Sequence, residues 1–179
     1  MGQLPAKPSP KPLMIPLSHP FSSEKKATRV CVFSKDPARE LKDQLCKIDV
    51  PCIAKVIGYD KLKRNYKQFK DKRALLNDYD AFLADLRIYK MLPECLGRTF
   101  YNAKKYPCPI KMHGMTDQEL ATQLNNAASS TFFIQGNGPN YSVRVGQTDQ
   151  KAENVAANTA KALAQALAHV TVWDDINFE

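Results

Sequence analysis

The sequence offers one obvious means of binding anions, a run of lysine and arginine residues with aromatic residues between them. Residues 55–73 carry eight basic and two acidic side chains, a net charge of +6. Such cations neutralise phosphates and release counterions, and aromatic rings can stack on bases. Five of these eight cations are predicted to bind the anion: Lys61, Lys63, Arg64, Lys67 and Lys70. The alternative is a solvated helix face, and we expect the interleaved rings of Tyr66 and Phe69 to lie in the core.

A second basic group follows the third predicted helix of the chain. Its members are Arg98, Lys104, Lys105 and Lys111, and the neighbouring aromatic residues are Phe100, Tyr101 and Tyr106. The first three of these cations are also predicted to contact a polyanion. The aromatic residues carry the same ambiguity between a binding surface and a core.

The sequence lacks the motifs of nucleotide-binding proteins and of hydrolases. Residues 136–141 begin like a dinucleotide-binding loop, but the last glycine is missing and the segment lies between two predicted strands. A hairpin turn is the better interpretation. The sequence also contains no GxxxxGK[ST], HExxH or GxSxG pattern.

Isolated histidines and carboxylates do not make a catalytic or metal site. His19, His113 and His169 are separated by about 50 residues or more, with no carboxylate at ligand spacing. Asp85 follows a predicted strand, where α/β enzymes place acids, but a helix cap or loop carboxylate is the simpler interpretation. We therefore predict no enzyme activity, catalytic residue, metal, cofactor or small-molecule substrate.

Composition and charge distribution narrow the choice of partner. The 179 residues carry a net charge of +8, and this charge divides into +12 over residues 1–111 and −4 over residues 112–179. The five cysteines form no CxxC pair, as expected of free thiols in a reducing compartment. No segment has the length and hydropathy of a membrane span, and no secretory signal begins the chain. We expect an anionic partner and no membrane association.

Residues 28–110 show the alternation of a parallel α/β domain. Apolar runs at 30–33, 53–57, 81–84 and 109–110 alternate with helical patterns, including one continuous helix over 60–76. Asp36 and Pro37 are predicted to start the first helix. This order predicts a parallel sheet with right-handed crossovers, covered by helices.

The flanking sequence predicts a second, α+β domain. Thr116 and Glu119 form a capping box for a helix that runs to about residue 128, and an alanine-rich helix is expected at 152–168. Strands at 131–135 and 141–145 are expected to form a hairpin, and a further strand is expected within 170–178. We expect residues 13–27 to pair with residues 131–147, which makes the domain over 28–110 an insertion into a discontinuous domain of residues 1–27 and 111–179.

Several segments together resemble the ribosomal L1-domain family, above all its eukaryotic nucleolar ribosome-assembly branch. They are Ile15–Pro20, Tyr79–Asp85, Leu96–Tyr101 with its Leu-Gly-Arg-x-Phe-Tyr pattern, Lys104–Ile110, Ser142–Gln147, Glu153–Ala157 and Trp173–Ile176. The resemblance covers nearly the whole chain from about residue 13. It implies a two-domain protein in which a Rossmann-like α/β domain is inserted into a discontinuous α+β domain.

The resemblance also implies RNA binding through the discontinuous domain. Ser142, Arg144, Gly146 and Gln147 stand at positions of the family's RNA-contacting hairpin, although Gln147 replaces the usual lysine. The family's first helix and strand and its last strand have no counterpart here, so we expect a chain truncated at both ends.

The leading hypothesis is a ribosome-biogenesis factor of the nucleus and nucleolus that binds precursor rRNA and works with pre-ribosomal particle proteins. A structural component of the large-subunit stalk is a second hypothesis. A protein-interaction adaptor, whose basic helix docks on an acidic partner, is a third.

Overall fold

The computed structural model describes residues 12–20, 29–48, 50, 52–135 and 140–169. The chain divides into a central unit, Glu24–Ala128, and a flanking unit, Met1–Ser23 with Ser129–Glu179. We describe the two units separately.

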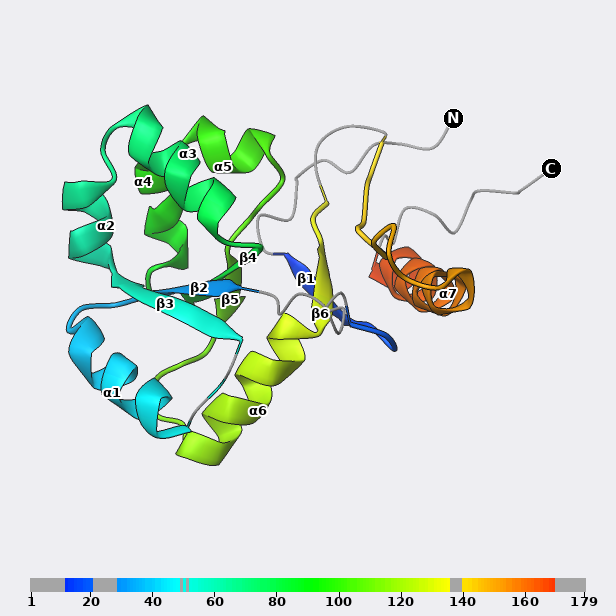
Figure 1. Ribbon diagram of the computed structural model, residues 1–179, viewed down its shortest axis with the longest axis horizontal. Coiled ribbons are helices and arrows are strands. Elements are labelled where there is room, and N and C mark those ends of the chain that lie inside the picture. The colour runs from blue at the N-terminus through cyan, green and yellow to red at the C-terminus, as the bar shows by residue number, and fades with distance from the viewer. Residues whose placement is uncertain (1–11, 21–28, 49, 51, 136–139, 170–179) are drawn as a thin grey trace. The chain divides into compact units, whose positions relative to one another are not determined.

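The central unit is built on a four-stranded parallel sheet in the order β3-β2-β4-β5 (Figure 1). The strands are β2 (Val30–Ser34), β3 (Ile53–Gly58), β4 (Ala81–Asp85) and β5 (Cys108–Ile110). Every residue of β2 is buried, as the uninterrupted apolar run predicts for a central strand. The predicted mixed α/β fold with a parallel sheet is confirmed.

Helices cover both faces of this sheet (Figure 1). One face carries α2 (Tyr59–Asn65), α3 (Phe69–Asp78), η1 (Tyr89–Met91), α4 (Leu92–Leu96) and α5 (Arg98–Asn102). The other carries α1 (Ala38–Ile48) and α6 (Asp117–Ala128). On the first face, the ring of Phe82 stacks on Phe33 at 5.7 Å and meets Phe100 edge-on at 4.9 Å. This aromatic cluster forms the centre of the core under α2–α5.

The single helix predicted over residues 60–76 is in fact two helices. The amide of Tyr66 still donates to the carbonyl of Leu62 at 3.1 Å, but the ψ of Tyr66, 41°, lies outside the helical region. Gln68 is extended, with a ψ of 146°, and α3 begins after it. The break changes which side chains face the sheet, because Leu62 and Leu75 are buried whereas Phe69 is exposed.

The start of α2 depends on a residue from another part of the chain. The carboxylate of Asp36 accepts the Asp60 amide at 2.8 Å, so this side chain, predicted to cap the helix after it, bonds the first turn of α2. Gly58 allows this approach, since a Cβ there would collide with Asp36 and lie 3.0 Å from the Cβ of Ala38. The end of β2 thereby fixes the start of the basic helix.

The predicted capping box opens α6. Thr116 donates its amide to Glu119 at 2.9 Å, and Glu119 donates its amide to the Thr116 hydroxyl at 3.4 Å. Hydrogen bonding from Thr116 to the carboxylate, above all from its amide, lowers the pKa of Glu119. In the structure α6 belongs to the central unit, where it contacts α1, whereas the sequence prediction placed residues 111–128 in the discontinuous domain.

The flanking unit joins segments from both ends of the chain. Strand β1 (Leu13–Pro16) pairs antiparallel with β6 (Ser130–Phe133), and α7 (Ala152–His169) packs on this pair. The predicted return of the early segment is confirmed for residues 13–16. Ile15, Phe133 and Ala162 form the centre of this second core.

The predicted hairpin is wrong in its second strand. Residues 141–145 form no strand, although their side chains keep the alternation of one, with residues 141, 143 and 145 partly buried and residues 142 and 144 exposed. Apolar packing holds this segment, because Tyr141 meets Phe133 edge-on at 5.8 Å and Val143 and Val145 join the same core. The predicted turn at 136–139 and the strand expected within 170–178 lie outside the described residues.

Candidate nucleic-acid interface

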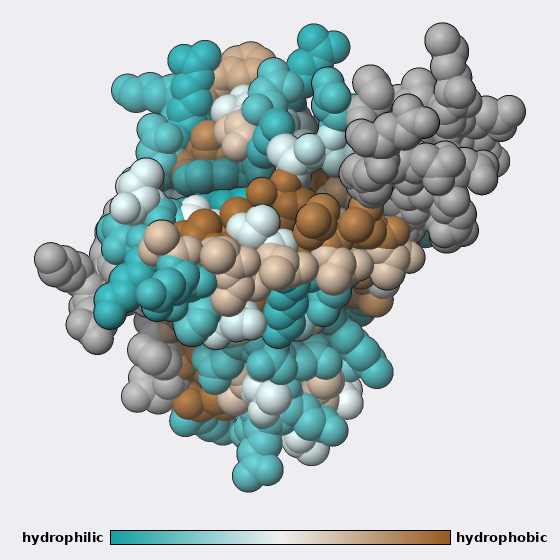
Figure 2. Space-filling model, turned by 90° about the vertical axis from the view of Figure 1, so that its right-hand side faces the viewer, coloured by the Kyte–Doolittle hydropathy of each residue, from teal (hydrophilic) through white to brown (hydrophobic). Residues whose placement is uncertain are grey.

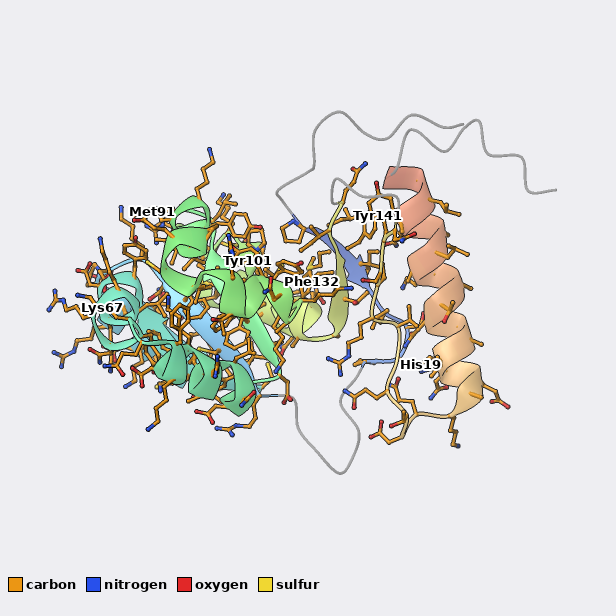
Figure 3. The ribbon with its side chains drawn as sticks, turned by 90° about the horizontal axis from the view of Figure 1, so that it is seen from above. His19, Lys67, Met91, Tyr101, Phe132 and Tyr141 are labelled. Atoms are coloured by element: carbon orange, nitrogen blue, oxygen red, sulfur yellow. The ribbon has the colours of Figure 1, made fainter. Side chains whose placement is uncertain are left out.

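The structure places the predicted basic residues on the outer surface of α2, α3 and the turn between them. Leu62 and Leu75 anchor the two helices to the core, and both are almost fully buried. Figure 3 shows Lys67 at this turn, among side chains that end in nitrogen and point away from the ribbon. All five predicted cations are exposed: Lys61, Lys63, Arg64, Lys67 and Lys70. We call these five residues the basic surface.

Little of the charge on the basic surface is neutralised by acidic neighbours. Asp60 and Arg64 approach at 4.0 Å, one turn apart, with 62% and 78% of their side chains exposed. Such a long, solvated pair contributes little to stability and leaves the guanidinium accessible. The basic surface therefore keeps its attraction for an anionic partner.

The two aromatic residues of this region behave differently from one another. Tyr66 is half-buried, and its hydroxyl lies 3.2 Å from the Lys55 ammonium, which packs over the ring. This bond raises the pKa of Lys55. Phe69 is 68% exposed, so the prediction that it belongs to the core is wrong. The helix break explains the error, since the period that placed both rings on one stripe assumed an unbroken helix.

The second basic group splits into surface and structural residues. Arg98 begins α5 and is exposed, and Lys104 is exposed with a φ of 55°. Lys105 instead donates its ammonium hydrogens to the carbonyls of Leu76 at 2.8 Å and Tyr79 at 2.9 Å. These carbonyls end α3, so Lys105 stabilises the end of a helix, as cations often do.

Lys72 links the two basic groups within the central unit. Its Nζ lies 3.8 Å from the position that a Cβ would take on Gly97, the residue before Arg98. Lys72 therefore extends the basic surface from α3 toward the start of α5.

In the flanking unit, the segment that resembles the family's RNA-contacting hairpin presents its polar side chains outward. Ser142 and Arg144 are exposed, while Gln147 is half-buried and its amide donates to the Gln150 side chain at 3.2 Å. Gly146 packs closely on α7, because a Cβ there would lie 2.8 Å from a methyl group of Val155. The segment is therefore held in place by the core packing of Tyr141, Val143 and Val145 and by the contact of Gly146 with α7.

Asn158 is the organising residue of this unit, and the sequence analysis missed it. It is completely buried on α7, and its amide donates to the carbonyls of His19 at 2.8 Å and Val145 at 3.1 Å. Its side-chain oxygen accepts the His19 amide at 3.0 Å. Figure 3 shows His19 beside α7 in this arrangement. An asparagine on the buried face of a predicted helix was the available signal, because buried amides require partners.

The candidate catalytic carboxylate is occupied by a structural contact. Asp85 is buried at the end of β4 and accepts the Arg87 amide at 3.0 Å and two guanidinium bonds at 2.9 and 2.6 Å. This arrangement agrees with the loop carboxylate that the sequence favours over a catalytic acid. It raises the pKa of Arg87.

Other groups give no sign of catalytic chemistry within the described ranges. There, no three His, Cys, Asp or Glu side chains gather as a metal site, and no helix is long and apolar enough to cross a membrane. Burial raises the pKa of the Cys31 thiol to about 12, which keeps it protonated and unreactive.

The flanking unit also contains an apolar groove of about 420 Å³. Figure 2 shows apolar side chains on the side of the molecule that this view presents. The groove is lined by Phe133, Asn140, Tyr141, Val143, Val145, Thr159, Ala162, Leu163, Ala166 and Leu167. These residues include no carboxylate, histidine or lysine, so they supply no general acid or base near neutral pH.

Comparison with known proteins decides the family. The model of the ribosomal protein L1p/L10e family matches residues 3–176. The chain belongs to this family.

Relatives of this chain include proteins whose names refer to ribosome biogenesis. A Schizosaccharomyces pombe protein named for ribosome biogenesis is 32% identical over 152 residues, which cover 84% of this chain and 39% of the relative. Mouse ribosomal L1 domain-containing protein 1 is 31% identical, covering 80% of this chain and 32% of the relative. Ribosome biogenesis protein UTP30 of Saccharomyces cerevisiae is 29% identical, covering 75% and 54% respectively. The chain thus spans between a third and about half of the length of these relatives.

Proposed function

We propose that this L1-family chain is a non-enzymatic ribosome-biogenesis factor that binds structured precursor rRNA. The observation that carries the proposal is the exposure of all five cations of the basic surface on α2, α3 and the turn between them. The names of the relatives support the assignment to ribosome assembly. The proposed partners are precursor rRNA and pre-ribosomal particle proteins, and the proposed site of action is the nucleolus.

The mechanism is recognition of phosphate and RNA shape at two places. The basic surface, together with Arg98 and Lys104 of the same unit, supplies long-range attraction and phosphate contacts. The flanking unit supplies short-range polar contacts through Ser142, Arg144 and Gln147. Because the basic surface acts mainly through phosphate contacts, its contribution to RNA affinity is expected to depend steeply on salt concentration.

A salt series with structured rRNA tests this function. The observed affinity of the chain should fall as salt rises, and the fourfold variant K61E/K63E/R64E/K67E should bind at least about tenfold more weakly near 0.1 M salt with a shallower slope. The matched control is K35E/R39E/K42E/K47E, which makes the same change in net charge at exposed residues in and before α1. Figure 1 shows α1 on the other face of the sheet.

Three results would contradict RNA binding by the basic surface. These are an affinity that does not change with salt, equal losses in the two fourfold variants, or no loss in either. Association with pre-ribosomal particles that survives nuclease would favour the adaptor function. Co-sedimentation with translating ribosomes would favour the stalk component.

A further inference from the structure

Phe69 is an exposed aromatic side chain in the middle of the basic surface. Among the described residues, five large apolar side chains are exposed, and Phe69 is the aromatic one and the most exposed, at 68%. The others are Met14, Leu86, Met91 and Leu163, with 43–57% exposed. The Phe69 ring does not contribute to the core of the central unit, because Leu62 anchors α2 and Leu75 anchors α3.

Lysines neighbour this ring in space and along the chain. Lys72, one turn further along α3, places its Nζ 5.9 Å from the ring centroid. Lys67 and Lys70 flank Phe69 in sequence and are exposed, as is Gln68. The ring therefore has no exposed apolar neighbour along the chain from 67 to 70, which argues against a hydrophobic protein interface at this point.

We propose that Phe69 is a stacking platform for an unpaired base of RNA, with Lys67, Lys70 and Lys72 holding the adjoining phosphates. This inference rests on the proposed RNA binding and adds the class of ligand, single-stranded nucleotides next to structured RNA. Exposed aromatic rings set in a cationic surface bind single strands in this way, because each base offers a π-face and each nucleotide a phosphate.

Two other ligands would not use this combination. In a continuous RNA duplex the bases are stacked on one another, so the duplex meets the cations but not the ring. An acidic peptide would also be attracted by the lysines, without requiring an aromatic residue at position 69. The side chain at 69 therefore distinguishes an unpaired nucleotide from both.

The first experiment compares single-stranded and duplex RNA in the full chain. Phe69→Leu keeps an apolar side chain but removes the π-face, and it should weaken binding of a ten-nucleotide uridine strand by about fivefold or more. Binding of a blunt RNA duplex should change by less than twofold. Phe69→Trp should retain or strengthen binding of the strand, and Met91→Ala, at another exposed apolar residue of the central unit, should leave it unchanged.

A second experiment places a reporter at the site itself. The chain has a single tryptophan, Trp173, so a Phe69→Trp substitution combined with W173F carries one indole at the proposed platform. Its fluorescence should be quenched by the uridine strand and much less by a strand of abasic residues with the same number of phosphates. Quenching of equal size by both strands would contradict stacking.

The outcomes separate this inference from the proposed function. If the wild-type chain binds RNA with the expected salt dependence but F69L binds the uridine strand equally well, the platform is wrong and RNA binding stands. A chain that binds neither RNA overturns both. Displacement of the labelled uridine strand by polyglutamate at a lower concentration of negative charge than by the unlabelled strand would assign the surface to an acidic protein.

Discussion

The basic surface of the central unit and the 142–147 segment of the flanking unit are positioned in different ways. The basic surface lies on two helices whose inner sides are anchored locally by Leu62 and Leu75. The 142–147 segment forms no strand, and its place depends on bonds from Asn158 and Gln150, in and before α7. One surface follows from helical periodicity and charge, whereas the other requires contacts between distant parts of the chain.

This difference predicts that one substitution at a buried residue disrupts the 142–147 segment and leaves the basic surface intact. Asn158→Leu removes three partly buried hydrogen bonds to the backbone of His19 and Val145, which should lower the stability of the flanking unit by about 3 kcal/mol. Hydrogen exchange should accelerate in β1, β6 and α7 and not in β2–β5. The salt dependence carried by the basic surface should be retained.

The control for this substitution is Thr159→Ala, at the next, exposed position of α7. It removes a hydroxyl that bonds the Val155 carbonyl within the helix. Equal exchange rates in N158L and the wild type would show that the flanking unit does not depend on Asn158.

A smaller effect is expected at Lys105, which separates structural from binding lysines. Lys105→Met should destabilise the central unit by about 1–2 kcal/mol, because the carbonyls of Leu76 and Tyr79 lose a charged donor. Denaturant unfolding measures this loss. The slope of RNA affinity against salt should stay close to that of the wild type.

Lys90→Met is the matched control, since Lys90 is an exposed cation of the same unit. It should change stability by less than about 0.5 kcal/mol. If K105M changed the salt slope as strongly as substitution of Lys67, Lys105 would belong to the binding surface after all.

The smallest effect is expected at Asp60, where the charge of the basic surface can be raised. Asp60→Asn removes the 4.0 Å ion pair with Arg64 but keeps the backbone amide that bonds Asp36. Stability should change by less than about 0.5 kcal/mol, since an exposed pair contributes little. RNA affinity at low salt should rise about twofold, and the gain should fade as salt screens the charge. A loss of RNA affinity would place Asp60, rather than Arg64, in the interface.

Much of the architecture could be predicted from the sequence, because it depends on local patterns. The apolar run of β2, the alternation of strands and helices, and the capping box at Thr116 each have a local physical cause. The exposure of the cations on α2 and α3 follows similarly from their places on an amphipathic pattern. The insertion of one unit into another was an expectation of the same kind, drawn from a change in pattern along the chain.

The sequence predictions failed where a contact between distant residues overrode a local pattern. The period through Leu62, Tyr66 and Phe69 suggested one helix, but the chain breaks at 66–68 and turns Phe69 outward. The alternation at 141–145 suggested a strand, but these residues form none, and the ring of Tyr141 packs edge-on against Phe133. Side-chain period reports which residues face a core, and it does not report where backbone bonds go.

The sequence by itself determined the parallel α/β pattern, the concentration of positive charge before residue 112 and the family resemblance. Only the tertiary structure decided which side chains are exposed for binding and which are used in contacts within the fold. Lys105 is turned onto the end of α3, Asp36 onto the start of α2, and Phe69 out among lysines. The physical reason is that a hydrogen bond or a buried ring depends on the position of a distant partner, whereas charge and apolar period are properties of the residues themselves.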